Sequence, residues 1–454
     1  MTSMRDALMG AVLTPADAGF EEATRLWNGR IRRRPALVVT PADGAEVAAA
    51  IAFARERGLA VSVRGGGHNI GGTALADGGL AIDMSGFRTV TVDPGERTAT
   101  VGAGCRLADV DRATQAHGLA TPLGFVSRVG VAGLTLGGGL GVLTRRFGWT
   151  VDNLLAAEVV TADGAVRRIS RDAEPDLFWA LRGAGANLGV VTSFTYRLHR
   201  VGPAVYGGLI AWPFERAAEV MDVYRTVTAD APRELAVWLS LLTAPPEPFV
   251  PPQWQGRKLC AMAVCYTGDP RDGDDAVAPL RALGEPALDL LAVTQYTDIQ
   301  SYLDDTEPEG MHYDWRSEFL AGLTGELLGT MRELFADCPA PMADIGLLHL
   351  GGALNEYAGD DGAVGNRDAR YVVGVKGMWP PGEPEEERFR AWVGTGGDRI
   401  RPYGLGRTYI NFQGPDESAA RVRATYGANY PRLLEIKRRY DPDNVFRSNR
   451  NIRP

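Results

Sequence analysis

The stretch Arg64-Gly65-Gly66-Gly67-His68-Asn69-Ile70-Gly71-Gly72 decides the fold prediction. It follows the alternating segment 59–63, which is typical of a β-strand. Three consecutive glycines after a strand allow positive φ angles and a close approach of the backbone to a ligand, because no Cβ stands in the way. Their amides can form an anion-binding concavity that suits a pyrophosphate. Taken alone, the stretch is equally consistent with a tight turn.

A second glycine-dense stretch, GVAGLTLGGGLG at 130–141, favours nucleotide binding, because one turn does not need two such loops. A Rossmann fingerprint requires GxGxxG. Gly139-Leu140-Gly141-Val142-Leu143-Thr144 lacks the last glycine, and the first loop does not fit either. The pattern therefore predicts a dinucleotide site on a different fold.

The composition excludes several classes of partner. The 454 residues are 45% hydrophobic and 23% charged, with 48 basic and 56 acidic residues and a net charge of −8. A negative surface repels phosphate backbones and anionic lipid heads, so neither nucleic acid nor membrane is an expected partner. No apolar run approaches 18 residues, and the start at 1–6 opens no secretory signal, which favours a cytoplasmic protein.

No metal site is expected, because neither HExxH nor a CxxC pair occurs, and a P-loop is also absent. The four cysteines are expected to be reduced, buried thiols: Cys105, Cys260, Cys265 and Cys338.

The order of predicted elements indicates an α+β protein. Up to about residue 199, helices and strands alternate between glycine loops: helices at 43–58 and 106–117, strands at 59–63, 80–84 and 157–161, and a hairpin at 89–101. Beyond residue 200, longer elements and proline-rich loops indicate a second domain: helices at 214–229, 316–336 and 430–439, and strands at 259–266, 346–350 and 407–412.

His68 directly follows the first glycine run and has two interpretations. It is either a loop histidine that hydrogen-bonds the backbone, or a neutral imidazole that bonds covalently to the 8α carbon of a flavin. Spacing alone does not choose between them.

These stretches together resemble the berberine bridge enzyme-like FAD-linked oxidases of the vanillyl-alcohol oxidase superfamily, in order and over nearly the full length. The resemblance rests on seven stretches: 35–39, 64–72, 101–104, 130–139, 152–153 with 189–192, 409–412, and 440–452. It implies a two-part PCMH-type FAD-binding domain at 1–200, a substrate domain at 201–402 with an antiparallel sheet covered by helices, and a C-terminal module at 403–454 that returns to the FAD domain.

The resemblance also implies which residues bind FAD, with His68 as the covalent link. The other expected cofactor residues are Arg64, Gly65, Gly66, Gly67, Asn69, Ser127, Val129, Gly130, Gly133, Gly137, Gly138, Asp152, Asn153, Val191, Asn411, Asn449 and Asn451.

Two positions near the second loop refine this expectation. Many relatives carry a second covalent link from a cysteine four residues before the first glycine of that loop, where this chain has Val126. A single tether is therefore expected. Val129, directly before Gly130, resembles the small residue that lets oxygen reach the reduced flavin, which favours an oxidase over a dehydrogenase.

Four residues are candidates for catalysis. Tyr409, in a Tyr-x-Asn motif, is the first choice for the base, and needs a nearby cation or hydrogen-bond donor to lower its pKa from about 10. Tyr313 and Arg316 lie in a segment that resembles the substrate side of the family's site, and His349 lies on an alternating strand. Three of them have a structural alternative: a buried interface aromatic for Tyr409, a surface helix residue for Arg316, and a core histidine for His349.

The expected function is an FAD-dependent oxidase that removes hydride from an alcohol, a sugar or a specialised metabolite and passes the electrons to oxygen, giving hydrogen peroxide. A dehydrogenase, an enzyme that forms C–C or C=C bonds, and a flavin-binding protein without turnover are the alternatives. The chain is expected to act as a monomer or homodimer on a small molecule. Fold and cofactor do not specify the substrate, although three tryptophans suggest an aromatic pocket: Trp254, Trp315 and Trp379.

Overall fold

The first glycine loop leaves the edge of a small sheet. In the computed structural model, which describes residues 10–454, this sheet has the order β1 (Ala11–Leu13), β2 (Leu37–Thr40), β4 (Leu80–Asp83) and β3 (Val61–Arg64). The prediction that no secretory signal begins the chain falls on residues outside the described part. Strand β3 pairs in parallel with the buried strand β4, so the glycines that follow it start from a fixed edge.

Helix α3 (Gly44–Glu56) connects β2 to β3 and begins as the sequence predicts. The Asp43 side chain accepts a hydrogen bond from the Glu46 amide at 2.9 Å. The Glu46 carboxylate accepts from the amide of Ala42 at 2.8 Å. A short helix, α2 (Phe20–Ala23), precedes β2.

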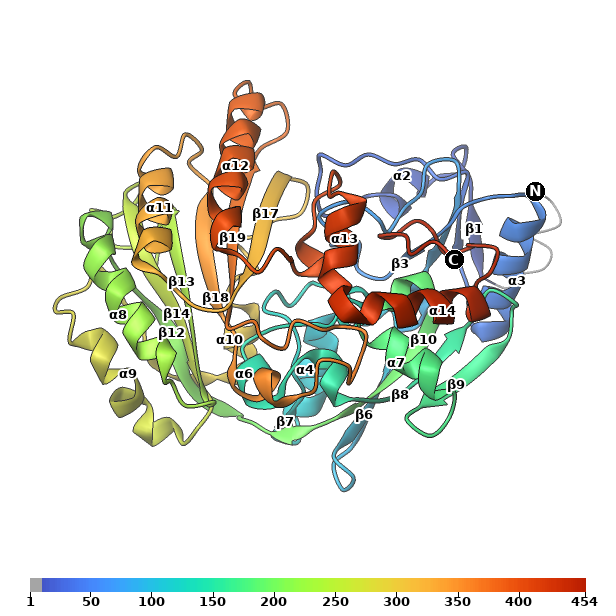
Figure 1. Ribbon diagram of the computed structural model, residues 1–454, viewed down its shortest axis with the longest axis horizontal. Coiled ribbons are helices and arrows are strands. Elements are labelled where there is room, and N and C mark those ends of the chain that lie inside the picture. Colours follow the sequence, from blue (N-terminus) through green and yellow to red (C-terminus); the bar gives the residue numbers. More distant parts are fainter. Residues whose placement is uncertain (1–9) are drawn as a thin grey trace.

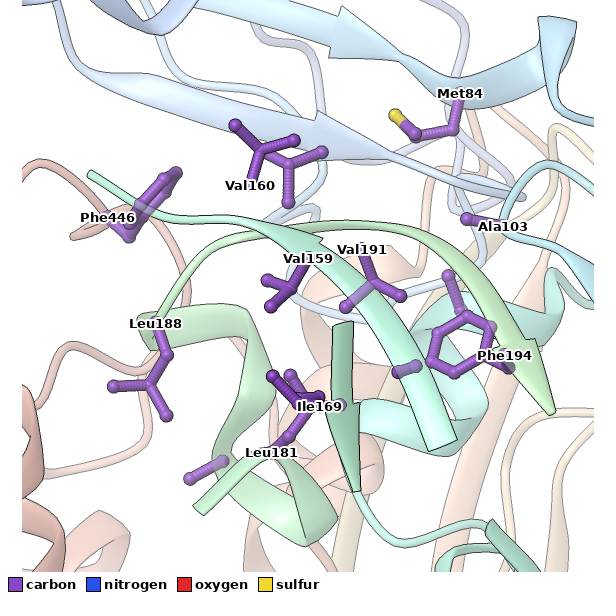
Figure 2. Packing of buried hydrophobic residues seen from close by; sticks show 14 of the residues in the cluster. Met84, Ala103, Val159, Val160, Ile169, Leu181, Leu188, Val191, Phe194 and Phe446 are labelled. Carbon is purple, nitrogen blue, oxygen red and sulfur yellow. The ribbon is translucent and has the colours of Figure 1, made fainter. Parts of the chain in front are cut away.

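The second sheet is antiparallel and contributes the rest of the hydrophobic core in the half of the molecule that holds the glycine loops. Its order is β5 (Val90–Asp93), β6 (Thr98–Gly102), β10 (Val190–Arg197), β8 (Leu154–Val160) and β9 (Val166–Ser170). The helices and short strands around it are α4 (Leu107–Gln115), β7 (Leu119–Ala120), α5 (Val131–Leu136), α6 (Thr144–Phe147), α7 (Pro175–Ala184) and β11 (His199–Arg200). Figure 2 shows Val159 of β8 and Val191 of β10 packed close to Leu181 and Leu188.

A third, eight-stranded antiparallel sheet makes up the other half of the molecule (Figure 1). Its strands run in the order β15 (Leu288–Asp289), β12 (Ala204–Pro213), β14 (Lys258–Tyr266), β13 (Leu235–Thr243), β18 (Asp344–His349), β19 (Tyr371–Trp379) and β17 (His312–Leu320), and β16 (Ala292–Gln295) also pairs with β12. The helices of this half are α8 (Ala217–Ala229), α9 (Gly273–Arg281), α10 (Tyr296–Ser301), α11 (Gly325–Ala336) and α12 (Glu386–Ile400). Figure 1 shows α8, α11 and α12 along the outer face of this sheet, away from the half that holds the glycine loops.

The chain finally returns to the half that holds the glycine loops, through α13 (Ala419–Tyr426) and α14 (Tyr430–Tyr440), the red helices of Figure 1. Phe446 is buried in the same core as β8 and β10 (Figure 2). The turn before Phe446 is fixed by the buried Asp441 carboxylate. It pairs with Lys437 at 2.6 Å and also accepts from the amides of Val445 and Phe446.

Three local predictions are wrong. The helix predicted at 316–336 begins only at Gly325, where Thr324 caps it; residues 312–320 form strand β17. The strand predicted at 407–412 is absent, because after one pair of backbone hydrogen bonds with Phe319 the chain turns into a 3₁₀ segment at Ile410–Phe412. All four cysteines are free, but Cys338 is only partly buried. Across residues 10–454, no helix combines the length and the apolar character needed to cross a bilayer.

Candidate functional site

A large cavity lies where the glycine loops face the eight-stranded sheet. Its wall includes both glycine loops, backbone from the segment 183–191, the motif at 409–412 and the C-terminal segment 446–450. Segments far apart in the sequence therefore build one site.

The two glycine loops touch each other through their backbones, which explains why both need glycine. A Cβ on Gly66 would lie 2.4 Å from the Gly130 nitrogen, and a Cβ on Gly130 would lie 2.2 Å from the Gly66 nitrogen. Both distances are far below van der Waals contact. The loops form one surface only because neither residue has a side chain.

This surface leaves room for a ligand on its open side. A Cβ on Gly133, in the first turn of α5, would meet nothing within 4 Å, and Gly133 is exposed and lines the cavity. The α5 N-cap residue, Gly130, supplies no side-chain cap. A glycine cradle with free space beside it, continued by apolar side chains such as Val191, fits a flavin dinucleotide.

His68 lines the cavity as a neutral imidazole. Burial, followed by the charges of Arg106 and Arg128, lowers the pKa of His68 from 6.5 to about 3. Trp27 stacks on its ring at 5.1 Å between centroids. A neutral ring held by a stacking partner has the lone pair that bond formation to carbon requires.

Val126, at the position of the second tether in relatives, also lines the cavity. None of the four cysteines does. Cys105 is buried, its Sγ donates to the Thr89 carbonyl at 3.5 Å, and burial raises the pKa of its thiol to about 11. These thiols have the character of buried structural cysteines rather than of reactive ones.

Tyr409 lines the cavity with its hydroxyl oxygen fixed by two donors. The oxygen accepts from the Gly139 amide at 3.0 Å and from Asn411 Nδ2 at 2.9 Å, and the ring stacks on Trp149. Burial raises the pKa of Tyr409, and these hydrogen bonds only partly oppose it. The expected hydrogen-bond donors are present. The pKa of Tyr409 is nevertheless raised, whereas a base that works near neutral pH needs a lowered pKa.

Most of the expected cofactor residues line the cavity. These are His68, Gly65, Gly66, Gly67, Asn69, Val129, Gly130, Gly133, Gly137, Val191, Asn411 and Asn449.

The others lie behind the wall and fix its shape. Arg64 donates to Asp83 at 3.1 Å, and Ser127 bonds the Asp304 carboxylate through its amide at 2.7 Å and its hydroxyl at 2.5 Å. A Cβ on Gly138, whose φ is +112°, would lie 2.8 Å from a Val364 methyl.

The later FAD-domain signature residues also stand outside the cavity. Asp152 forms a buried two-bond ion pair with Arg367, at 2.7 Å for each bond. Asn153 accepts from His199 Nε2 at 2.6 Å, if that nitrogen carries the proton. Asn451 is near the C-terminal wall, with its Oδ1 buried and without a partner.

Three of the four catalytic candidates do not line the cavity. Tyr313 is fully buried beneath Trp27 at 3.8 Å between ring centroids, and its hydroxyl donates to the Pro308 carbonyl at 2.6 Å. Arg316 lies on strand β17, not on a surface helix, and pairs with Asp314 and Asp416 at 2.7 Å each.

His349 also faces away from the cavity. It lies on the buried face of β18 and accepts from Arg145 Nη1 at 2.7 Å. Burial, followed by the charge of Arg145, lowers its pKa well below 6.5. This environment matches the core-histidine interpretation.

The cavity residues that sequence reasoning missed include Trp27 and Glu307. Neither stands in a motif, and only the fold brings the two together. Of the three tryptophans expected in an aromatic pocket, Trp315 lines the cavity, whereas Trp254 and Trp379 belong to other hydrophobic clusters.

Two family models match the chain, at the segments that build the cavity. Residues 35–170 match the FAD binding domain model, and residues 408–453 match the model described as berberine and berberine like.

Relatives match over nearly the whole chain. (R)-6-hydroxynicotine oxidase of Paenarthrobacter nicotinovorans is 30% identical over 99% of this chain and 97% of its own length. The crystal structure of 6-hydroxy-D-nicotine oxidase from Arthrobacter nicotinovorans has a TM-score of 0.86 at 27% identity and covers 98% of both chains.

A berberine bridge enzyme-like protein of Physcomitrella patens shares the fold, with a TM-score of 0.88 at 23% identity over 98% of this chain and 97% of its own. The glycine cradle, the FAD-binding segment and the C-terminal module thus agree with the full-length matches: the chain belongs to the berberine bridge enzyme-like family of FAD-dependent oxidoreductases.

Proposed function

We propose that this protein is an oxidase with one covalent tether to FAD, through His68. The substrate is a small molecule: an alcohol, a sugar or a specialised metabolite. When bound, FAD supplies a two-electron acceptor that takes hydride from the substrate and passes the electrons to oxygen, giving hydrogen peroxide. A relative that is itself an oxidase, 6-hydroxynicotine oxidase, supports this assignment over a dehydrogenase.

The neutral His68 in the cavity wall is the observation that carries the proposal. Its lowered pKa keeps the lone pair available at neutral pH, and stacking on Trp27 holds the ring in place. Val126 supplies no second nucleophile on the same wall. One tether is therefore expected rather than two.

Other wall residues have supporting roles. Tyr409 and Asn411 form a fixed hydrogen-bond pair that orients the substrate and takes part in its proton transfer. Val129 keeps a small side chain at the cavity wall, which leaves oxygen a path.

The tether is tested by denaturing the protein in acid and measuring the yellow colour that stays with the polypeptide. The wild-type protein should keep its flavin, and His68→Ala should lose the acid-stable label. The exposed His117 offers a matched control, and His117→Ala should keep the label. A flavin peptide linked through cysteine would contradict the proposal.

Oxygen use is tested separately. The enzyme is reduced without oxygen and then mixed with air-saturated buffer, and flavin absorbance should return rapidly with release of peroxide. Slow reoxidation in air would instead assign the protein as a dehydrogenase.

A further inference from the structure

Within residues 10–454, the segment 201–402 contributes only two side chains to the cavity wall: Glu307 and Trp315. Substrate recognition by this segment must therefore act through them or through what they position. Glu307 is one of two charged side chains on the wall, and the other, Arg450, comes from the C-terminal segment.

Glu307 is held rigidly between the two halves of the molecule. Its backbone carbonyl accepts from Trp27 Nε1 at 3.0 Å, and Trp27 is the residue that stacks on His68. Its Oε1 accepts a hydrogen bond from the ammonium of Lys376. Glu307 lines the cavity, and its Oε2 has no hydrogen-bond partner among the described residues.

The charges around Glu307 do not balance. Lys376 also pairs with Asp344, at 2.7 Å, so one ammonium serves two carboxylates and one negative charge is left over. Burial, opposed by Lys376 and reinforced by the charge of Asp344, raises the pKa of Glu307. A buried group with this excess charge gains most from a cationic partner.

Aromatic rings complete the surroundings of this carboxylate. Trp27, Trp315 and Phe412 line the same cavity, and the last two stack at 4.4 Å between centroids. Aromatic faces attract ammonium groups, most strongly where water is excluded. A carboxylate with a free oxygen in a cavity lined by aromatic side chains is a combination that selects cations over neutral or anionic groups.

We propose that Glu307 is the specificity-determining residue of this cavity and that the substrate carries a protonated amine, which the free Oε2 of Glu307 binds. This inference rests on the proposed function and narrows its substrate class. A neutral sugar or alcohol gains nothing from the unbalanced charge, and a carboxylate substrate is repelled by it.

The experiment measures binding to the FAD-loaded protein of three probes of similar shape: benzylamine, benzyl alcohol and benzoate. Dissociation constants come from shifts in flavin absorbance and, independently, from the shift of Tm. Benzylamine should bind about tenfold or more tightly than benzyl alcohol, as expected for one charge-assisted hydrogen bond, and benzoate more weakly than either.

The decisive variant is Glu307→Gln, which keeps the shape of the side chain and leaves the Lys376–Asp344 pair in place. It should abolish the preference for benzylamine and leave the affinity for benzyl alcohol within about twofold of wild type. Glu307→Asp keeps the charge and should retain part of the preference, which covers the case in which the glutamine variant folds poorly. Glu309→Gln removes an equal charge from an exposed position on the same loop and should change nothing.

An amine preference that survives in Glu307→Gln, or no amine preference in the wild type, would overturn the proposal. Binding requires no turnover, so the result stands apart from the proposed oxidase activity. Probe binding without flavin reduction by any substrate would count against the oxidase and not against the role of Glu307.

Discussion

The two walls of the cavity are built in opposite ways. On the FAD side, the part of the wall where the two glycine loops meet is backbone, since no side chain stands between Gly66 and Gly130. The opposite wall depends on side chains, with Glu307 from the loop before β17 and Trp315 from β17 itself. The backbone part suits a cofactor held by a domain that the family shares, and the side chains opposite it are where the proposed substrate specificity would arise.

The largest expected effect comes from adding one methyl group to the backbone wall. In Gly66→Ala the new Cβ would lie 2.4 Å from the Gly130 nitrogen, and because backbone atoms of both loops are involved, neither can yield without moving the cradle. The purified variant should contain almost no FAD, measured as the ratio of flavin to protein absorbance.

Gly394→Ala is the matched control for that change. A Cβ at Gly394, inside helix α12, would meet nothing within 4 Å. This variant should keep its FAD and gain up to about 1 kcal/mol in the free energy of unfolding, because alanine favours helix more than glycine does. Normal FAD content in Gly66→Ala would show that the contact between the loops is not what shapes the cradle.

A smaller effect is expected where the walls meet, at Tyr409. Tyr409→Phe removes the hydroxyl that accepts from the Gly139 amide and from Asn411. The rate of anaerobic flavin reduction should fall about a hundredfold, at the lower end for loss of an acid–base group. The buried Gly139 amide also loses its partner, at a cost of about 1–3 kcal/mol.

These two effects are measured separately, by stopped-flow reduction and by urea unfolding. A loss of stability with an unchanged reduction rate would confine Tyr409 to a structural role. That result would suit the raised pKa of its hydroxyl.

A further expected effect, on stability and its pH dependence, concerns a polar contact between the two halves. Asp111, on helix α4, accepts from Gln300 of helix α10 at 3.2 Å, and Gln300 also donates to the Gly124 carbonyl of the cavity wall. Burial raises the pKa of Asp111 from 3.8 to about 7, which the bond to Gln300 only partly opposes. Asp111 Oδ1 is buried without a partner, so ionisation here is not compensated.

Because the folded-state pKa is the higher one, the stability from Asp111 is fully present below pH 3.8 and is lost as the pH rises to about 7. Relative to Asp111→Asn, the wild type should lose about 1.4 kcal/mol per pH unit in this window. Urea unfolding of both proteins at pH values across this window measures the difference in the free energy of unfolding. Contributions from the histidines cancel, because both proteins contain them. A pH-independent difference would mean that Asp111 ionises in the folded protein as readily as in the unfolded one.

The same contrast explains what could be predicted from the sequence. The glycine loops and strand β8 follow from local patterns, since alternating apolar residues mark a strand and a backbone site appears in the sequence as runs of glycine. The helix predicted at 316–336 was wrong at its start, because the sequence of β17 carries no strand pattern stronger than the pattern of the helix that follows it. Glu307 left no pattern at all, since its role depends on Lys376 and Trp27, distant in sequence and joined only by the fold.

The return of the chain to the FAD half also sets an order of events during synthesis. Residues 446–450 close a wall that begins at β3 and the first glycine loop. At about 5–20 residues per second, a ribosome makes the later segment on the order of 20–80 s after the earlier one. Until then the glycine loop and His68 lack the C-terminal part of their site, so we expect cofactor capture to be a late step in synthesis.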